Sequence, residues 1–304
     1  MHHVVTSGAG FIGTTLVRRL LMDSGSTVTV VDDLSTGKPG NLHSLADFVE
    51  ADVAEHWWIN EISDPDVIWH LASPCSPSDY QVRRVDTLLT NALGTGNALE
   101  LARQFGAKFV LASTSEVYGD PLVHPQPEEY WGNVSSLGPR SCYDEGKRYA
   151  EALTVAAAWE YGLDVRIARI FNTYGPHMPD DGRVVIRFLT ATLNGEPIEV
   201  HGTGEQTRSF CYVTDTVDAL VRLAASGLQV CNIGSPREVT INALAEEVLT
   251  VIGTGGQIKH IDGDVDDPQR RCPDITQARS LGWSPDVRLR QGLQATAAWL
   301  RETR

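Results

Sequence analysis

Short apolar runs alternate with amphipathic stretches along the first half of the chain. The runs are continuous rather than alternating in polarity, which is typical of strands that are buried on both faces of a parallel sheet. They lie at residues 3–6, 27–31, 67–72, 108–113 and 164–170. Between them, apolar residues recur every three or four positions, as crossover helices require. Those stretches are residues 11–22, 83–103 and 143–159.

Strands that alternate with helices predict a doubly wound α/β sheet. Beyond residue 172 the pattern is less regular. There we expect strands at 198–201 and 229–233, a helix at 214–225 and a last helix at 289–301. The chain therefore divides into a sheet-forming domain, residues 1–172, and a smaller C-terminal α/β domain, residues 173–304, and it is free to cross between the two.

The charge balance of the chain is strongly acidic. Its 304 residues include 25 Lys and Arg against 39 Asp and Glu, a formal net charge of −14. Such a surface repels phosphate backbones and anionic lipids, so we expect neither nucleic acid nor membranes as partners. To bind a small anionic substrate, a protein with this overall negative charge needs a few arginines close together at the binding site. We expect the acidic run at 262–267 to be a solvated loop, because Gly263 and Val265 interrupt it.

The five cysteines are odd in number and form no C-x-x-C pair, which argues against a disulfide framework and against a metal site built on thiolates. We expect buried or inert thiols and no bound metal. A glycine loop follows so soon after Met1 that we expect no signal peptide, and no run approaches the roughly 20 apolar residues of a membrane span. These observations predict a cytoplasmic protein.

The first expected strand leads into Gly8-Ala9-Gly10-Phe11-Ile12-Gly13, a G-x-G-x-x-G motif that opens a helix. Backbone amides and the helix N-terminus at such a turn cradle a pyrophosphate, as in a Rossmann-like fold. Asp32 ends the second strand at the spacing where a carboxylate meets the adenosine ribose, which favours NAD over NADP. We expect Asp52 and Val53 near the adenine, with a helix cap or loop acid as an equal alternative for Asp52.

Tyr143 and Lys147 form a Y-x-x-x-K motif, so both side chains share one helix face, one turn apart. A lysine ammonium and a positive nicotinamide ring both favour the phenolate, which makes Tyr143 a candidate base. Thr114, Ser115 and Glu116 follow the fourth strand, and ligands of open α/β sheets lie outside the carboxyl ends of strands. We expect Thr114 or Ser115 to share a substrate hydroxyl with Tyr143, and Glu116 to point at the same region.

Longer ordered segments carry a resemblance along nearly the whole chain. They are HLASP (70–74), LASTSEVYGDP (111–121), GPRSCYDEGKR (138–148), ARIFNTYGP (168–176), DGRVV (181–185), QTRSFCYV (206–213) and DDPQRRCPDI (266–275). The chain resembles the extended short-chain dehydrogenase/reductase family, and within it the nucleotide-sugar decarboxylases that turn UDP-glucuronate into UDP-xylose. The resemblance implies a lyase that holds NAD tightly and catalyses no net redox change.

In the chemistry that this resemblance implies, NAD takes a hydride from carbon 4 of the sugar while Tyr143 takes the hydroxyl proton. The resulting β-keto acid loses carbon dioxide before the hydride returns. By matching position, Thr114 and Ser115 lie near the carbon 4 oxygen and the carboxylate. Glu116 is the acid that orients the sugar or handles a proton, and Lys147 tunes Tyr143.

The string Thr114-Ser115-Glu116 also separates neighbouring activities. The 4,6-dehydratases that the chain resembles carry Thr-Asp-Glu, because expelling the carbon 6 hydroxyl needs an acid that a serine cannot supply. The 4-epimerases of the family usually lack the Glu. A 4,6-dehydratase or a 4-epimerase is therefore the enzymatic alternative. A non-enzymatic NAD-sensing binding protein is the other, although it would not need the Tyr143 and Lys147 pair.

The resemblance also implies which residues meet the cofactor and the nucleotide sugar. Cofactor positions at the end of the third expected strand are Leu71 and Ala72. Substrate positions are Pro74 and Tyr80 over the sugar, Asn172 and Arg208 at the diphosphate or ribose, Arg271 as a diphosphate clamp, and Arg183 and Val184 on the nucleotide side. In an acidic protein, such individual guanidiniums must meet the anionic donor.

Three residues depart from the family pattern, and two of them bear on which nucleotide the protein recognises. Ser7 follows Thr6 where the family has Thr-Gly, so a side chain enters a tight turn. His177 replaces the usual Arg and His201 stands where Tyr is common, which leaves a TDP-linked donor open beside UDP. The resemblance further implies a homodimer joined through the helices at 83–103 and 143–159.

Overall fold

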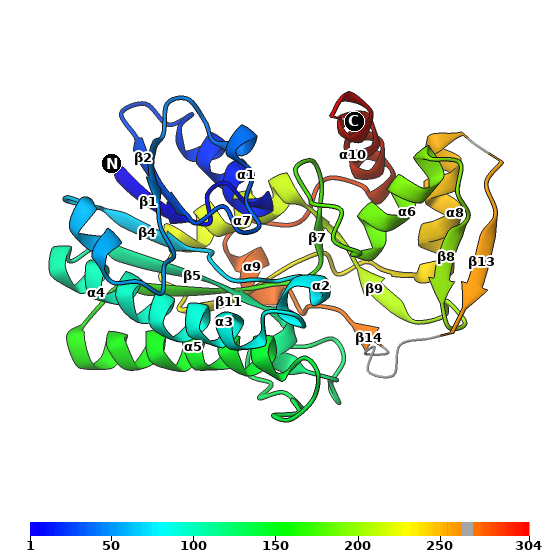
Figure 1. The fold of residues 1–304 in the computed structure, drawn as a ribbon. Coiled ribbons are helices and arrows are strands. Elements are labelled where there is room, and N and C mark those ends of the chain that lie inside the picture. Colours follow the sequence, from blue (N-terminus) through cyan, green and yellow to red (C-terminus); the bar gives the residue numbers. More distant parts are fainter. Residues whose placement is uncertain (254, 263–269, 304) are drawn as a thin grey trace.

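The computed structural model describes residues 1–253, 255–262 and 270–303. At its centre lies a seven-stranded parallel sheet in the order β11-β6-β5-β4-β1-β2-β3 (Figure 1). The strands are β1 (His2–Thr6), β2 (Thr27–Asp32), β3 (Asp47–Glu50), β4 (Val67–His70), β5 (Lys108–Thr114), β6 (Val165–Ile170) and β11 (Val230–Ile233). The predicted Rossmann-like sheet is confirmed. Its order reverses between β1 and β4, the switch point where such sheets bind ligands.

Helices cover both faces of this sheet (Figure 1). One face carries α1 (Phe11–Leu20), α7 (Val213–Ala224) and α9 (Thr276–Ser280), and the other carries α3 (Arg84–Leu89), α4 (Thr95–Phe105) and α5 (Ser141–Tyr161). The helix expected at 83–103 is interrupted, because a π-helical turn, η3 (Thr90–Gly94), joins α3 to α4. The remaining short helices are η1 (Pro39–Asn41), η2 (Trp57–Glu61), α2 (Pro77–Tyr80) and η4 (Ser115–Tyr118).

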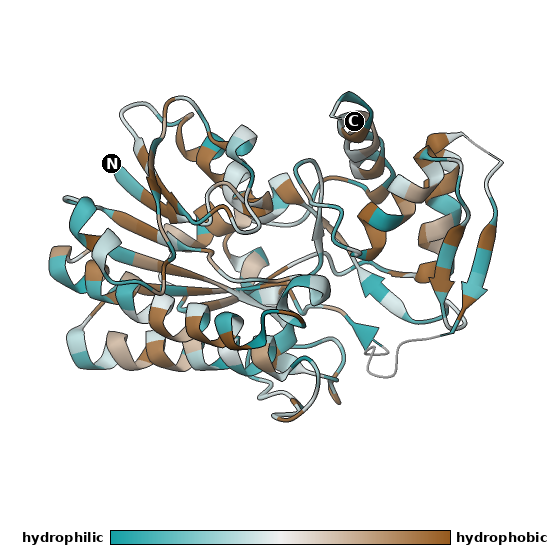
Figure 2. Ribbon diagram, viewed as in Figure 1, coloured by the Kyte–Doolittle hydropathy of each residue, from teal (hydrophilic) through white to brown (hydrophobic). Residues whose placement is uncertain are grey.

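The sheet residues are apolar at successive positions because both faces are buried. In β1, Val5 packs into one core and Val4 into the other, and Val110 and Phe109 of β5 divide in the same way. All four side chains are at most 1% exposed. Figure 2 shows the apolar residues concentrated in these strands and on the inner faces of the helices.

A second α/β unit packs beside the carboxyl ends of the strands. Its core joins α6 (Val184–Leu193), α8 (Ile241–Ile252) and α10 (Leu289–Glu302) to the strand pair β8 (Ile198–His201) and β13 (Ile258–Ile261). A three-stranded sheet follows the order β12 (Glu238–Thr240), β9 (Thr207–Ser209), β14 (Arg270–Arg271). The short pair β7 (Thr173–Tyr174) and β10 (Cys211–Tyr212) completes the strands in the described residues.

The chain crosses between the two units more than once. Residues 229–233, expected in the second half, form β11 and pair with β6 in the central sheet, where they cover an edge that would otherwise expose unpaired backbone groups. The helix expected at 214–225 is α7, which also packs on that sheet. Of the acidic run at 262–267, only Asp262 lies within the described residues. No helix of the described chain is long and apolar enough to cross a membrane.

Candidate active site

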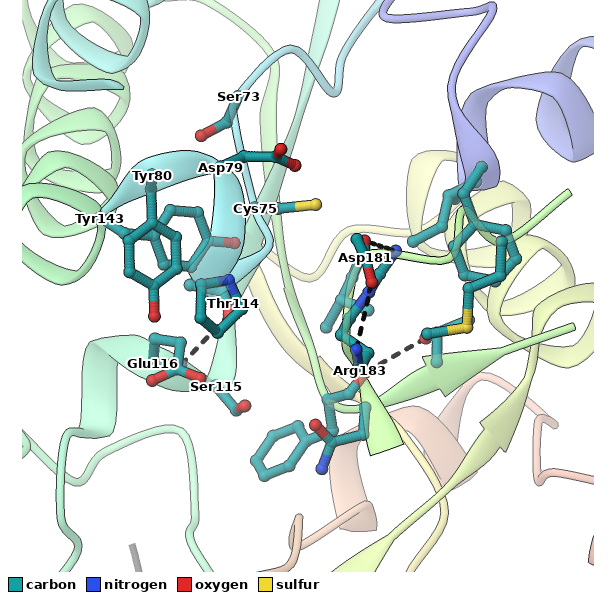
Figure 3. A pocket seen from close by; sticks show the side chains of 18 of the residues that line it. Ser73, Cys75, Asp79, Tyr80, Thr114, Ser115, Glu116, Tyr143, Asp181 and Arg183 are labelled. Carbon is teal, nitrogen blue, oxygen red and sulfur yellow. Dashed lines mark hydrogen bonds and ion pairs between the residues drawn. The ribbon is translucent and has the colours of Figure 1, made fainter. Parts of the chain in front are cut away.

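A cavity of about 380 Å³ lies at the carboxyl ends of the central strands and extends to α6 and β9. It gathers most of the residues expected from the sequence. They are Gly10, Phe11, Ile12, Gly13, Leu71, Tyr80, Thr114, Ser115, Glu116, Tyr143, Lys147, Asn172, Arg183, Val184, Arg208 and Arg271. Figure 3 shows Tyr143 and Glu116 on one side of this cavity and Asp181 and Arg183 on the other.

A smaller cavity of about 30 Å³ adjoins the first and shares Ser7, Thr36 and Ser73 with it. Its lining contains five more of the expected residues, which are Asp32, Asp52, Val53, Ala72 and Pro74. Gly8, also expected at the cofactor, lines neither cavity. Pro74, expected over the sugar, therefore lines the smaller cavity, between Ser73 and Cys75 of the main one. The Asp52 carboxylate accepts the Ala54 N–H at 2.9 Å, so it caps a local turn while lining this cavity.

The glycine loop leaves no room for side chains. A Cβ at Gly13 would lie 2.0 Å from the Ser7 carbonyl oxygen, and one at Gly8 would lie 2.7 Å from Val30 of β2. The buried Asp32 carboxylate accepts the Ala9 N–H at 3.0 Å, which ties the end of β2 to this loop. Burial raises the pKa of Asp32. A close-packed loop at a helix N-terminus beside an acidic strand end fits a dinucleotide with free ribose hydroxyls.

Ser7 carries the strain expected from its position in the loop. Its φ is +57°, in the left-handed region that favours glycine. Its N–H donates to the Val31 carbonyl at 2.8 Å, which holds the loop in this conformation.

Tyr143 and Lys147 both lie on α5, and at neutral pH Lys147 is charged whereas Tyr143 is not. The Tyr143 ring stacks on Tyr80 with centroids 5.2 Å apart. Burial, reinforced by the Cys75 thiol, raises the pKa of Tyr143 well above its ordinary value, although a hydrogen bond with Thr114 acts in the opposite direction. Lys147 Nζ donates to the Ala112 carbonyl at 2.9 Å, and burial lowers the pKa of Lys147 to about 8. At neutral pH Tyr143 is therefore a phenol that needs a further positive charge to ionise.

Glu116 is held by two arginines. The guanidinium of Arg271 binds its carboxylate through both terminal nitrogens, one of them 2.7 Å from Oε2, and Arg140 Nη1 lies 3.4 Å from the same oxygen. Burial favours the protonated acid, yet Arg271 and Arg140 outweigh it, so the pKa of Glu116 lies below its ordinary value. Arg271, expected as a diphosphate clamp, thus pairs with the Glu116 carboxylate in this structure.

Sequence reasoning also missed two residues at this site. Arg140 lies in the GPRSCY segment, three residues before Tyr143, and its place in that segment was the available signal. Cys75 was expected to be a buried or inert thiol, but it is exposed and lines the main cavity (Figure 3). The other four cysteines are buried.

Three further residues that were expected to bind the nucleotide sugar, Asn172, Arg183 and Arg208, also line the main cavity. Arg183 pairs with Asp181 at 2.8 Å and lies 5.6 Å over the Phe11 ring, which links α6 to the glycine loop. The Asn172 amide nitrogen is buried and finds no hydrogen-bond partner among the described residues. Arg208 is 8% exposed and donates to the Thr207 carbonyl at 2.8 Å.

Comparison with known proteins accounts for this arrangement. The NAD dependent epimerase/dehydratase family matches residues 3–234. The chain belongs to this family. Its NAD dependence agrees with the close-packed glycine loop and with Asp32.

Individual proteins match this chain in sequence or in structure over nearly its whole length. UDP-glucuronic acid decarboxylase 1 of Xenopus tropicalis is 48% identical over 307 residues, covering 98% of this chain and 72% of that protein. The UDP-glucose 4-epimerase of Thermotoga maritima superposes with a TM-score of 0.94 at 32% identity, covering 100% of this chain and 99% of that one. The UDP-glucuronic acid 4-epimerase of Bacillus cereus, solved with UDP-glucuronic acid and NAD, gives 0.91 at 26% identity, with 100% of both chains covered.

Proposed function

We propose that this protein is an NAD-dependent UDP-glucuronate decarboxylase, a carboxy-lyase that forms UDP-xylose through a 4-keto sugar without net redox change. One observation carries the proposal. Thr114, Ser115 and Glu116 meet Tyr143 and Arg271 in one cavity, in a chain that is 48% identical to a UDP-glucuronic acid decarboxylase. Ser115 offers no acid for expelling a hydroxyl, whereas loss of carbon dioxide needs none.

The side chains of the cavity divide the work of the oxidation. The glycine loop and Asp32 would hold NAD, which would supply the hydride acceptor for carbon 4 of the sugar and the hydride needed for the final reduction. Tyr143 takes the proton of the carbon 4 hydroxyl, and Thr114, hydrogen-bonded to Tyr143, orients that hydroxyl. Lys147, one helical turn away, contributes positive charge that favours the Tyr143 phenolate. Stacking on Tyr80 holds the Tyr143 ring in a single orientation.

Glu116 binds the sugar in this scheme and does not act as an acid. Because Arg271 and Arg140 keep Glu116 ionised, it accepts hydrogen bonds from sugar hydroxyls and does not donate a proton. The ketone formed at carbon 4 accepts the electron pair that the departing carboxylate leaves behind. The resulting enolate takes one proton from water at carbon 5 before the ketone is reduced again. Removing that carboxylate therefore requires orientation in the cavity more than acid catalysis.

The deciding experiment incubates the purified protein with NAD and either UDP-glucuronate or TDP-glucuronate, followed by mass spectrometry of the nucleotide sugar. We expect the mass of the nucleotide sugar to fall by that of one carbon dioxide. The donor that is converted faster shows whether the enzyme prefers a uridine or a thymidine nucleotide. Persistence of both hexuronates would refute the decarboxylase. Tight NAD binding without any turnover would instead support an NAD-sensing binding protein.

A second candidate activity, 4-epimerisation of UDP-glucuronate, is favoured by the fold of the Bacillus cereus enzyme, which matches this chain at a TM-score of 0.91. The same assay separates it, because an epimer keeps the mass of the substrate and differs in chromatographic retention. A 4,6-dehydratase acting on a hexose donor would give a product lighter by one water.

We further propose a cytoplasmic homodimer. Val85, Leu88 and Leu93 recur at helical spacing along α3 and η3 and are 67%, 42% and 51% exposed, and Tyr149 on the neighbouring α5 is 52% exposed. This apolar face supports a helical interface. Light scattering after gel filtration tests it, since Leu93→Glu should yield monomers while a monomeric wild type would refute the dimer. Free thiols at all five cysteines support a reducing compartment.

A further inference from the structure

The ion pair between Glu116 and Arg271 joins two residues that are far apart in sequence. Glu116 lies on η4 and Arg271 on the two-residue strand β14. On one side β14 is paired with β9, where Arg271 lies opposite Arg208, and Ser209 Oγ donates to the Arg271 carbonyl at 3.4 Å. A bidentate ion pair tolerates little displacement of either side chain. The backbone that follows Arg271 must therefore be held as firmly as β14 is held by β9.

Gln126 holds the segment that follows Arg271. Its backbone N–H donates to the Cys272 carbonyl at 2.9 Å, and its carbonyl accepts the Asp274 N–H at 2.9 Å. Its side-chain Oε1 accepts the Cys272 N–H at 2.9 Å, and its Nε2 donates to the Val123 carbonyl at 2.7 Å. Gln126 is fully buried, so each of these polar groups depends on its protein partner.

The loop that carries Gln126 is tied in turn to η4 and to the central sheet. Tyr118, the last residue of η4, accepts the Asn133 N–H on its carbonyl at 2.9 Å and donates its hydroxyl to Asn232 Oδ1 at 2.8 Å. Asn232 on β11 donates its amide to the Gln126 carbonyl at 2.9 Å and its N–H to Glu128 Oε1 at 2.7 Å.

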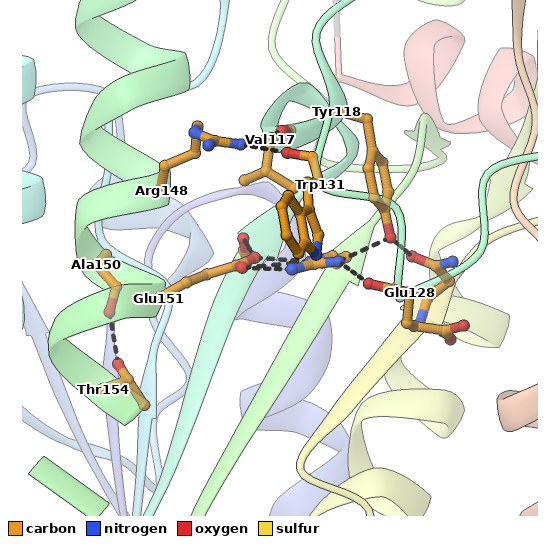
Figure 4. A network of polar contacts seen from close by, with 11 residues as sticks. Val117, Tyr118, Glu128, Trp131, Arg148, Ala150, Glu151 and Thr154 are labelled. Atoms are coloured by element: carbon orange, nitrogen blue, oxygen red, sulfur yellow. Dashed lines mark hydrogen bonds and ion pairs between the residues drawn. The ribbon is translucent and has the colours of Figure 1, made fainter. Parts of the chain in front are cut away.

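Further hydrogen bonds and an ion pair tie Tyr118 to the central sheet and to α5. Arg169 of β6 donates to the Tyr118 hydroxyl at 3.0 Å and pairs with Glu151 of α5 at 2.7 Å (Figure 4). The same network thus fixes η4 and the segment 272–274 relative to one sheet, with Gln126 as the member that touches the residue next to Arg271.

We propose that Gln126 is a positioning residue for the Glu116 and Arg271 pair. By accepting the Cys272 N–H it sets the chain just beyond Arg271, so that the guanidinium meets the Glu116 carboxylate with both nitrogens. Without that acceptor the buried Cys272 N–H loses its partner, the segment shifts, and Glu116 loses part of the positive charge that keeps it ionised. The kinetic consequence of this inference rests on the proposed function, but the placement of Arg271 does not.

The test compares three substitutions at Gln126. Gln126→Met keeps the length of the side chain and removes both of its hydrogen bonds. Gln126→Asn keeps an amide that is too short to reach Cys272, and it replaces Gln126→Met if that variant does not fold. Gln126→Glu retains the acceptor oxygen and is the conservative rescue. Thr296→Val is the matched control, because it removes one buried hydrogen bond, 2.7 Å long, from α10.

The first readout is urea unfolding at pH 8 and at about pH 3.5, below the ordinary range of a glutamate, with and without Glu116→Gln. We expect Gln126→Met to lower the urea midpoint more at pH 8 than at the acid pH, because the pKa of Glu116 is depressed and an ionised Glu116 without its cation is penalised only above its own pKa. In the Glu116→Gln background that pH dependence should vanish, and Thr296→Val should show none in either background. A loss that is equal at both pH values and unaffected by Glu116→Gln means a merely structural role and overturns the proposal.

The second readout is the pH profile of kcat/KM for decarboxylation. We expect the acid limb to move upward by about one pH unit in Gln126→Met, a loss of about tenfold on that limb, and to return in Gln126→Glu. An unmoved limb, or a Gln126→Glu variant that behaves like Gln126→Met, contradicts the role of the acceptor oxygen. A wild type that leaves UDP-glucuronate unchanged would refute the proposed function alone, because the unfolding readout requires no turnover.

Discussion

Replacing Ser7 by glycine should stabilise the protein. Ser7 adopts a φ of +57° at the first turn of the glycine loop. A left-handed conformation costs an L-residue about 1–2 kcal/mol, whereas glycine adopts it freely but loses about 0.5–1 kcal/mol more backbone entropy on folding. The Ser7 N–H bond to the Val31 carbonyl is a backbone contact that the substitution leaves in place. The net gain expected for Ser7→Gly is about 0.5–1 kcal/mol.

Urea unfolding measures this gain, with Ser24→Gly as the matched control. Ser24 is an exposed turn residue and is not among the residues with positive φ, so the same substitution there should destabilise the protein through backbone entropy alone. With a slope of about 2–3 kcal/mol per molar urea, Ser7→Gly should raise the midpoint by about 0.2–0.5 M. A midpoint that falls for Ser7→Gly as it does for Ser24→Gly would show that the Ser7 conformation carries no strain.

Other predictions concern charge and catalysis. Arg271→Met should cost about 3–5 kcal/mol by stranding a buried carboxylate. Without Arg271, burial raises the pKa of Glu116, so the loss measured by urea unfolding should be large at pH 7.5 and shrink as Glu116 is protonated towards pH 4.5, and a pH-independent loss would contradict it. Tyr143→Phe keeps the ring stacked on Tyr80, so calorimetry should show unchanged donor binding while carbon dioxide release falls by about 10²–10⁴; wild-type release would exclude Tyr143 as the base. Burial, reinforced by Glu116, raises the pKa of Asp144 to about 7, so the carboxyl destabilises the fold increasingly as pH rises from about 4 to about 7. Asp144→Asn should therefore gain more thermal stability relative to wild type at pH 8 than at pH 5, and equal differences at both would refute this.

Local patterns in the sequence were sufficient for most of the central sheet and for both motifs. The five expected strands appear because a strand buried on both faces has apolar residues at every position, as at Val4 and Val5. The glycine loop and the pair Tyr143 and Lys147 depend on contacts within a few residues, so their spacing alone predicts the turn and the shared helix face. The strand β3 (Asp47–Glu50) escaped prediction because it lies at the edge of the sheet and is mostly exposed.

Long-range contacts decided the rest of the site. No local signal places Arg271 against Glu116 or Gln126 against Cys272, since these contacts span more than a hundred residues and arise only when β14, η4 and the loop before α5 pack together. The return of the chain at β11 depends in the same way on pairing with β6. The sequence by itself determined the fold, the cofactor loop and the types of the catalytic residues, because these follow from periodicity and short spacing. The tertiary structure alone decided which charges face one another, and therefore which protonation state Glu116 holds.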